Sequence, residues 1–231
     1  MTPIAERLAR AKGYPYEAPE GSYLFADGET RPFRPDTLAG RTPVIAYGSN
    51  RSPLQLARKY AGWPAGTEIP VTVARLGGMD VVHSCHFTAY GSLPAMVVPA
   101  RGVTVTVAIV WLDGRQLERM HETEGGENYH YGSFEATELE LDCPLPPALY
   151  GYHGRRGAFA PDGPPLALAA IPATGRTGPA ATQEQALARA RDLLAPGADL
   201  DLFILEIIDD PALRAERTEA LAAFSSRQYA P

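Results

Sequence analysis

The chain has 231 residues, of which 45% are hydrophobic, and it contains 22 glycines and 22 prolines. This length and composition favour one elaborated domain with a buried core. The formal net charge is −6 and no block of lysine or arginine occurs, so nothing in the sequence supports binding to nucleic acid or to an anionic membrane. We therefore expect a small-molecule partner.

Targeting and redox signals are absent from the sequence. The N-terminus has no apolar stretch of signal-peptide length, and the longest apolar run, residues 103–112, is too short to span a bilayer. Two cysteines, Cys85 and Cys143, are too few for a disulfide framework, and neither lies in a Cys-x-x-Cys pair. We expect a cytoplasmic protein with reduced thiols, and the sequence leaves its oligomeric state unknown.

The first segment is a leader that is rich in proline, glycine and aromatic residues over residues 13–43. It is not polar enough to predict disorder, because its tyrosines and phenylalanines can bury apolar surface. We predict that residues 1–43 form an N-terminal extension packed on a body that begins at residue 44.

A tight turn follows the leader. The apolar run 44–46 is typical of a strand, and it ends in the tetrapeptide Tyr47-Gly48-Ser49-Asn50. A glycine lets the backbone approach a ligand closely, and the N–H groups of such a turn can converge on an anion. The pattern therefore predicts a ligand-binding loop between a strand and a helix.

The helix after this turn is expected to run from Pro53 to about Tyr60. Ser52 precedes it and Gln55 lies three residues further on, which is the spacing of a capping box. The sequence thus predicts that the side chains of Ser52 and Gln55 close the first turn of the helix.

Runs of β-branched and apolar residues predict four strands in the next segment, at 71–76, 80–87, 95–98 and 103–111. A second helix opens at 113–116 and closes at Gly125 and Gly126. Glu124 therefore lies at a helix C-terminus. The helix dipole and apolar neighbours such as Met120 would both favour the protonated form of its carboxyl group.

The remainder alternates between short strands and helices. Strands are predicted at 134–141 and 148–153, and a long surface loop rich in Gly, Pro and Ala is predicted at 154–179. Capping residues predict two helices at the C-terminal end, from Thr182 to about Ala195 and from Asp210 to about Phe224.

Four features occur in a fixed order: a strand ending in Tyr-Gly-Ser-Asn, an apolar strand ending in Trp111, a helix ending in Glu-x-Glu-Gly, and then a tyrosine. This ordered set, which covers residues 44–152, resembles the γ-glutamylcyclotransferase family. The resemblance implies an α+β fold with a mixed, strongly curved, barrel-like sheet and peripheral helices. It places one domain at 44–231, with a divergent helical part at about 182–231.

The resemblance also implies roles for particular residues. The loop Tyr47-Gly48-Ser49-Asn50 would grip a γ-glutamyl group, and Glu124 would be the catalytic acid/base. Three tyrosines are further candidates for the substrate pocket, namely Tyr131, Tyr150 and Tyr152. Tyr150 and Tyr152 share one face of a strand, so the sequence does not choose between them. The chain departs from the family at Arg51, where a leucine is usual.

The implied reaction is a cyclotransfer, in which the α-amine of a γ-glutamyl compound attacks its own γ-carbonyl and 5-oxoproline is released with an amine or amino acid. The attacking group is tethered to its target, so the enzyme must mainly fold the substrate and move protons. No metal and no organic cofactor are required. The alternative is a non-catalytic binding protein that uses the same pocket for a γ-glutamyl-like or carboxylate ligand.

Overall fold

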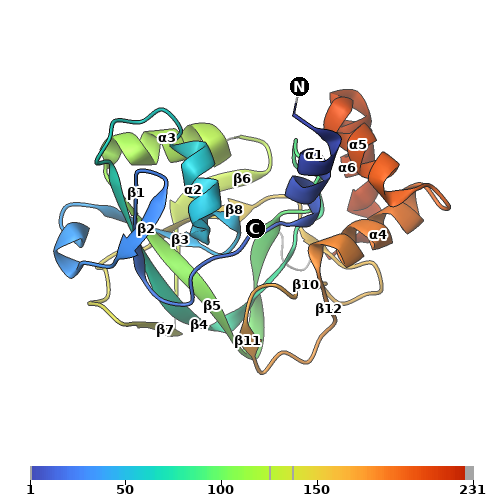
Figure 1. Cartoon of the computed structure of the whole chain (residues 1–231). Helices are drawn as coiled ribbons and strands as arrows, with labels where there is room; N and C mark the ends of the chain where they lie inside the picture. The colour runs from blue at the N-terminus through green and yellow to red at the C-terminus, as the bar shows by residue number, and fades with distance from the viewer. Residues whose placement is uncertain (1, 125, 137, 227–231) are drawn as a thin grey trace.

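A large mixed sheet forms the centre of the fold in the computed structural model, which describes residues 2–124, 126–136 and 138–226 (Figure 1). Its strands are β1 (Tyr23–Ala26), β2 (Glu29–Pro32), β3 (Thr42–Ala46), β4 (Glu68–His83), β5 (Ala95–Leu112), β6 (Tyr129–Ser133), β7 (Glu138–Leu141), β8 (Tyr150–Gly154), β10 (Ala167–Leu168), β11 (Ala173–Thr174) and β12 (Ala180–Ala181). A separate small sheet pairs β9 (Ala158–Phe159) with β13 (Ser225–Ser226).

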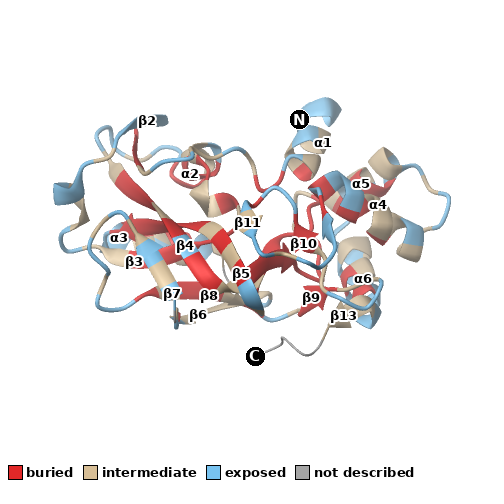
Figure 2. Cartoon of the chain, turned by 90° about the horizontal axis from the view of Figure 1, so that it is seen from below, coloured by how far each residue is buried: buried red, intermediate tan, exposed pale blue. Residues whose placement is uncertain are grey.

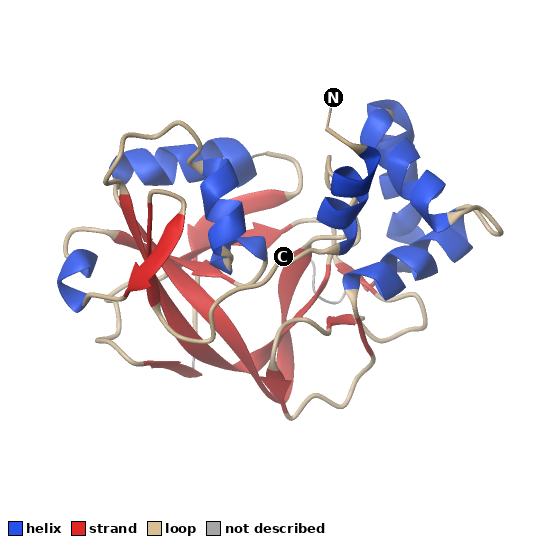
Figure 3. Ribbon diagram, in the orientation of Figure 1, coloured by secondary structure: helices blue, strands red, loops and turns tan. Residues whose placement is uncertain are grey.

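The helices lie in two groups (Figure 3). They are α1 (Ile4–Lys12), α2 (Pro53–Lys59), α3 (Gly114–Glu124), α4 (Gln183–Leu194), α5 (Leu200–Asp209) and α6 (Pro211–Leu221), with the short 3₁₀ turns η1 (Pro35–Leu38), η2 (Ser49–Arg51) and η3 (Ala222–Phe224). The first group, α2 and α3, covers one part of the sheet. The second group brings α1 from the N-terminus beside α4, α5 and α6 from the C-terminal part of the chain.

The two longest strands carry the core. The main path of the sheet runs β12-β10-β4-β5-β3-β8-β6, with β4 and β5 paired antiparallel over most of their length. Alternate residues of β5 belong to different clusters, because Val107 and Ile109 pack on one face while Val110 and Leu112 pack on the other. Both faces are therefore covered, and buried residues follow the strands in Figure 2.

The observed architecture is α+β with a large mixed sheet and several helices, in agreement with the prediction. The main path is open among the described residues, so the barrel-like closure stays a prediction. The four strands predicted between residues 71 and 111 are joined into two, β4 and β5, and the strand predicted at 80–87 ends at His83 instead of residue 87. The long strands continue through glycines 77, 78 and 102, with one register shift between Gly77 and Met79.

Three other predictions need correction. The capping box at Ser52 and Gln55 is wrong: Ser52 precedes α2, but no side chain caps the helix, and Ser52 Oγ and Gln55 Oε1 are buried without a hydrogen-bond partner among the described residues. The strand predicted at 134–141 is confined to β7, and Phe134 is a buried loop residue. The predicted surface loop at 154–179 contains β9, β10 and β11, and Leu168 within it is fully buried.

The C-terminal part contains three helices where two were expected. The capping box of Thr182 and Gln185 at the start of α4 is confirmed, and the Asp210 side chain caps α6 as predicted. The unexpected helix α5 begins after Asp199, whose carboxylate accepts hydrogen bonds from two backbone N–H groups. The predicted helix end at Gly125 lies outside the described residues. No helix in the described ranges combines the length and apolarity needed to cross a bilayer.

The first 43 residues are integrated into both halves of the fold. Strand β1 pairs with β4, while helix α1 packs against α4 and α5. Lys12 of α1 pairs with Glu184 and Asp201 of those helices, at 2.8 and 2.7 Å. The segment between α1 and β1, residues 13–22, crosses from the helical group to the sheet (Figure 1). We call this segment the strap.

Candidate functional site

A cavity of about 400 Å³ is located where the loop after β3 meets the end of α3 and strand β8. Six of the residues that the sequence analysis singled out line it: Tyr47, Gly48, Ser49, Asn50, Glu124 and Tyr152. The cavity therefore brings together two segments that lie more than 70 residues apart in the chain, since 74 positions separate Asn50 from Glu124.

The sheet topology explains this meeting. Strand β3 pairs in parallel with β8, so the C-terminal ends of both strands lie at the same edge of the sheet. The chain leaves β3 through Tyr47, whose hydroxyl donates a hydrogen bond to the carbonyl oxygen of Tyr152 on β8. The backbone of the predicted binding loop is thereby fixed to the neighbouring strand.

Glu124 contacts the loop directly. Asn50 Nδ2 donates a hydrogen bond to Glu124 Oε1, with 3.0 Å between the two atoms. The Glu124 side chain is 19% exposed, so it is neither buried completely nor directed into bulk water. The amide of Asn50 thus holds the carboxylate of Glu124 at the wall of the cavity.

A buried lysine is the second partner of this carboxylate. Lys59 Nζ forms an ion pair with Glu124 Oε1 and lies 3.2 Å from the sulfur of Met120. The Lys59 side chain is only 4% exposed. The ion pair therefore fixes Oε1 of Glu124 against the end of α2.

Packing between α2 and α3 fixes the position of Lys59. Arg119 Nε on α3 donates to the Lys59 carbonyl oxygen at 2.8 Å, and the Tyr60 hydroxyl donates to the Gln116 carbonyl oxygen at 2.9 Å. These bonds hold the end of α2 against α3. Asn50 and Lys59 both contact Oε1, which leaves Oε2 of Glu124 available for a ligand.

Contact with the strap leaves no space for a side chain at Gly48. A Cβ atom at this position would lie 2.4 Å from the hydroxyl oxygen of Tyr14 and 3.2 Å from Ala95 Cβ. Tyr14 is buried, and its hydroxyl accepts a hydrogen bond from Ala95 N at 2.8 Å, so it is not free to move away. The hydroxyl proton of Tyr14 has no acceptor among the described residues.

Tyr131 and Tyr150 do not line the cavity. Their rings stack on each other with 5.5 Å between centroids. The ring of Tyr131 also meets the edge of His121, which in turn contacts the Tyr152 hydroxyl through Nδ1 at 2.8 Å. The two tyrosines therefore form a layer behind Tyr152, and the geometry gives no support for their contact with a substrate.

The charge of Glu124 affects the tyrosines around it. Burial, followed by the negative charge of Glu124, raises the pKa of Tyr47 and of Tyr152 above the ordinary value. Burial also raises the pKa of Tyr14 and Tyr129, with Glu124 as a smaller cause. These hydroxyls stay protonated and remain hydrogen-bond donors at neutral pH.

Several lining residues escaped the sequence analysis. Tyr14 and Tyr90 come from segments without a motif, and His86 lies in the strand predicted at 80–87, to which no functional role was assigned. Burial and the charge of Arg156 lower the pKa of His86 to about 3, so its ring is neutral. Among the described residues, no three His, Cys, Asp or Glu side chains are grouped as metal ligands would be.

Arg214 is the most informative of these additions. It belongs to α6, and it is the arginine that the C-terminal helices contribute to the cavity lining. Its Nη1 donates to the Ile207 carbonyl oxygen at 2.9 Å. The part of the chain with no family resemblance therefore supplies a cation to the cavity, opposite in sign to Glu124.

No protein-family model matches the chain, and no curated protein matches it. Among solved structures, one named gamma-glutamyl cyclotransferase has 15% sequence identity and a TM-score of 0.36, and covers 83% of this chain and 92% of its own. An uncharacterised protein from Homo sapiens has 15% identity and a TM-score of 0.34 over the same shares. Likenesses of this size leave the function to be argued from the residues of the cavity.

Proposed function

We propose that the cavity binds a γ-glutamyl compound and catalyses cofactor-independent cyclotransfer, with Glu124 as general acid/base. The observation that carries this proposal is the hydrogen bond from Asn50 to Glu124, which joins the two motifs of the family resemblance across one cavity. The 15% identical solved structure bears the name of the same activity, and this agreement adds nothing beyond the motifs themselves.

The proposed reaction needs one base and one acid in sequence. Oε2 of Glu124 takes a proton from the α-ammonium group of the substrate, and the free amine attacks the γ-carbonyl carbon. A C–N bond forms and closes the five-membered ring. Glu124 then returns this proton to the leaving nitrogen and the original amide C–N bond breaks. The ring nitrogen gives up its second proton to the departing amine, so 5-oxoproline is released with an ammonium product, which is an amine or an amino acid.

Other cavity residues have roles that follow from their charge and hydrogen bonds. The hydroxyl of Tyr14 donates to no described residue, and we assign it the stabilisation of the negative oxygen that forms at the γ-carbonyl. Arg214 would hold a carboxylate of the substrate. Lys59 does not line the cavity, and we assign it the positioning of Glu124.

The experiment is a direct assay for 5-oxoproline. The purified chain is incubated with γ-glutamyl amino acids and γ-glutamyl amines, and the wild type is compared with Glu124→Gln, which keeps the shape of the side chain but removes its acid/base capacity. Glu122→Gln is the matched control, because Glu122 lies on the same helix, is exposed, and pairs with Arg119 at 2.8 Å. We expect turnover in the wild type and in the control variant, and a loss of about a hundredfold or more in Glu124→Gln.

A non-catalytic binding protein is the competing function. The observation in its favour is the ion pair, because a carboxylate already held by Lys59 can serve solely to orient a ligand. The same assay separates the two functions. Saturable binding of γ-glutamyl compounds, measured by calorimetry, without 5-oxoproline from any of them would support the binding protein and reject the enzyme.

A further inference from the structure

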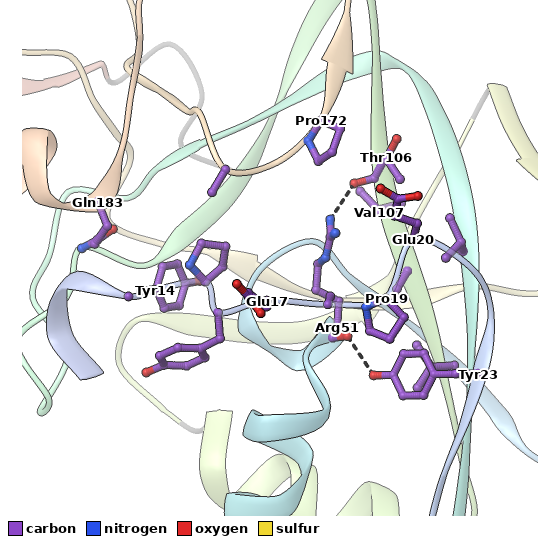
Figure 4. Close-up of a pocket in the computed structure, with 18 of the residues that line it drawn as sticks. Tyr14, Glu17, Pro19, Glu20, Tyr23, Arg51, Thr106, Val107, Pro172 and Gln183 are labelled. Atoms are coloured by element: carbon purple, nitrogen blue, oxygen red, sulfur yellow. Dashed lines mark hydrogen bonds between the residues drawn. The ribbon is translucent and has the colours of Figure 1, made fainter. Parts of the chain in front are cut away.

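A second and larger cavity, of about 760 Å³, lies between the strap and the sheet (Figure 4). Its volume is within the range of small-molecule sites in proteins. Tyr14 is part of the lining of both cavities, and so separates them. The second cavity does not include Glu124 or Asn50, so it is a different place from the proposed cyclotransfer site.

The cations Lys12 and Arg51 both line this second cavity. Lys12 is already paired with Glu184 and Asp201, whereas Arg51 has no carboxylate partner among the described residues. Arg51 directly follows Asn50, yet its side chain points away from the first cavity and into the second (Figure 4). Nη1 donates to the Thr106 carbonyl oxygen at 3.2 Å, which is the one side-chain hydrogen bond that Arg51 makes within the described residues. No described carboxylate lies within ion-pairing distance of its guanidinium group.

A partly buried guanidinium without a counter-ion is unfavourable. Burial lowers the pKa of Arg51 from its ordinary value, because the guanidinium group has lost part of its water. A guanidinium group has five N–H donors, and a carboxylate satisfies two of them at once in parallel. The unpaired donors of Arg51 therefore match a carboxylate ligand.

The rest of the lining limits what such a ligand can be. Apolar side chains form part of this lining, with Val71, Val73 and Pro172 among them. Glu17 and Glu20 of the strap also line the cavity, and both are exposed. Lys12 also lines the cavity, but its charge is balanced by its two carboxylate partners. The negative charges of Glu17 and Glu20 therefore disfavour phosphates and dicarboxylates and favour an ammonium group near solvent.

We propose that this second cavity binds a dipolar small molecule of the apolar dipeptide type, with its carboxylate on Arg51, its hydrophobic body against the sheet, and its ammonium group toward Glu17 and Glu20. The ligand enters beneath the strap, which forms one wall. This site is independent of the proposed cyclotransferase activity, and its test does not require turnover.

The experiment measures binding by calorimetry with three matched probes. Alanyl-phenylalanine carries both charges, its C-terminal amide lacks the carboxylate, and its N-acetyl derivative lacks the amine. We expect saturable binding of the free dipeptide and binding at least about tenfold weaker for the amide. The N-acetyl derivative should lose only a few-fold in affinity, because Glu17 and Glu20, the proposed partners of the ammonium group, are exposed.

Protein variants locate the site. Arg51→Met should abolish the preference for the free dipeptide over its amide, Arg51→Lys should retain part of it, and Glu124→Gln should bind like the wild type. Thermal melts show whether each variant is folded, and Arg51→Lys gives a second reading if Arg51→Met is not. Equal affinity for the dipeptide and its amide, unchanged binding in Arg51→Met, or no saturable binding of the dipeptide would each overturn the proposal.

Discussion

Lys59 and Glu124 form an ion pair that joins the last residue of α2 to the last residue of α3 beside the first cavity. The pair is asymmetric, because Lys59 is buried at 4% exposure while Glu124 retains 19%. Water can solvate the carboxylate but not the ammonium group. The lysine therefore depends on the glutamate more than the glutamate depends on the lysine.

This asymmetry gives the first prediction. Glu124→Ala leaves the buried ammonium group of Lys59 without its ion partner, and we expect the free energy of unfolding to fall by about 2–4 kcal/mol. Lys59→Met should cost less, since the remaining carboxylate is reached by water, and Lys59→Met combined with Glu124→Ala should recover part of the loss. Urea unfolding of the three variants measures these values. Equal losses that add in the double variant would contradict a direct pair.

Arg214 provides a test of substrate recognition. If it holds a carboxylate on the substrate, Arg214→Met should raise KM for γ-glutamyl compounds by about tenfold or more, with a smaller change in kcat. The control is Arg189→Met, because Arg189 is on another C-terminal helix and does not line the cavity. Its guanidinium group pairs with Asp162 at 2.5 Å. A fall in kcat with KM unchanged would assign Arg214 to the chemical step.

Gly48 and Tyr14 should be coupled in stability. Gly48→Ala places a Cβ atom 2.4 Å from the Tyr14 hydroxyl oxygen, and we expect a loss of about 1–3 kcal/mol. Tyr14→Phe removes that oxygen together with its hydrogen bond to Ala95 N, at a cost of about 1 kcal/mol. The double variant should be more stable than the sum of the two single losses predicts, as measured by urea unfolding. Strict additivity would show that the loop moves to avoid the contact.

Two buried histidines predict how stability depends on pH. Burial lowers the pKa of His83 to about 4 and, with the charge of Arg156, that of His86 to about 3, from an ordinary value of 6.5. Below that ordinary value the unfolded chain binds protons that the folded chain does not bind. The contribution of the two neutral rings to stability is therefore complete above pH 6.5 and is lost as the pH falls toward 4 and then 3.

Guanidinium unfolding from about pH 7 to about pH 4 measures this dependence, and the free energy of unfolding should decrease steadily over that window. His83→Gln should flatten the curve, because glutamine does not titrate there and can still approach the Ala181 carbonyl oxygen that His83 Nε2 contacts at 3.1 Å. A flat wild-type curve would mean that these two rings take up protons without unfolding.

Local sequence patterns predicted the elements best where one short stretch determines the outcome. The Thr182 and Gln185 capping box and the Asp210 cap depend on hydrogen bonds within a single helical turn, and both are present. The same pattern failed at Ser52 and Gln55, where tertiary packing buries both side chains. Helix α1 was missed although its sequence carries a local signal, with apolar residues on one face, Glu6 in its first turn and Lys12 in its last.

The sequence by itself determined the strand-turn-helix around Tyr47, the position of Glu124 near a helix end, and the order of motifs that suggested a function. Tertiary structure alone decided the partners of Glu124, the entry of Tyr14 and Arg214 into the first cavity, and the direction of Arg51 into the second. The physical reason is the distance along the chain over which each interaction acts. Backbone preference and capping act over a few residues, whereas cavities form from the register of β3 on β8 and the packing of α2 on α3, which no short pattern encodes.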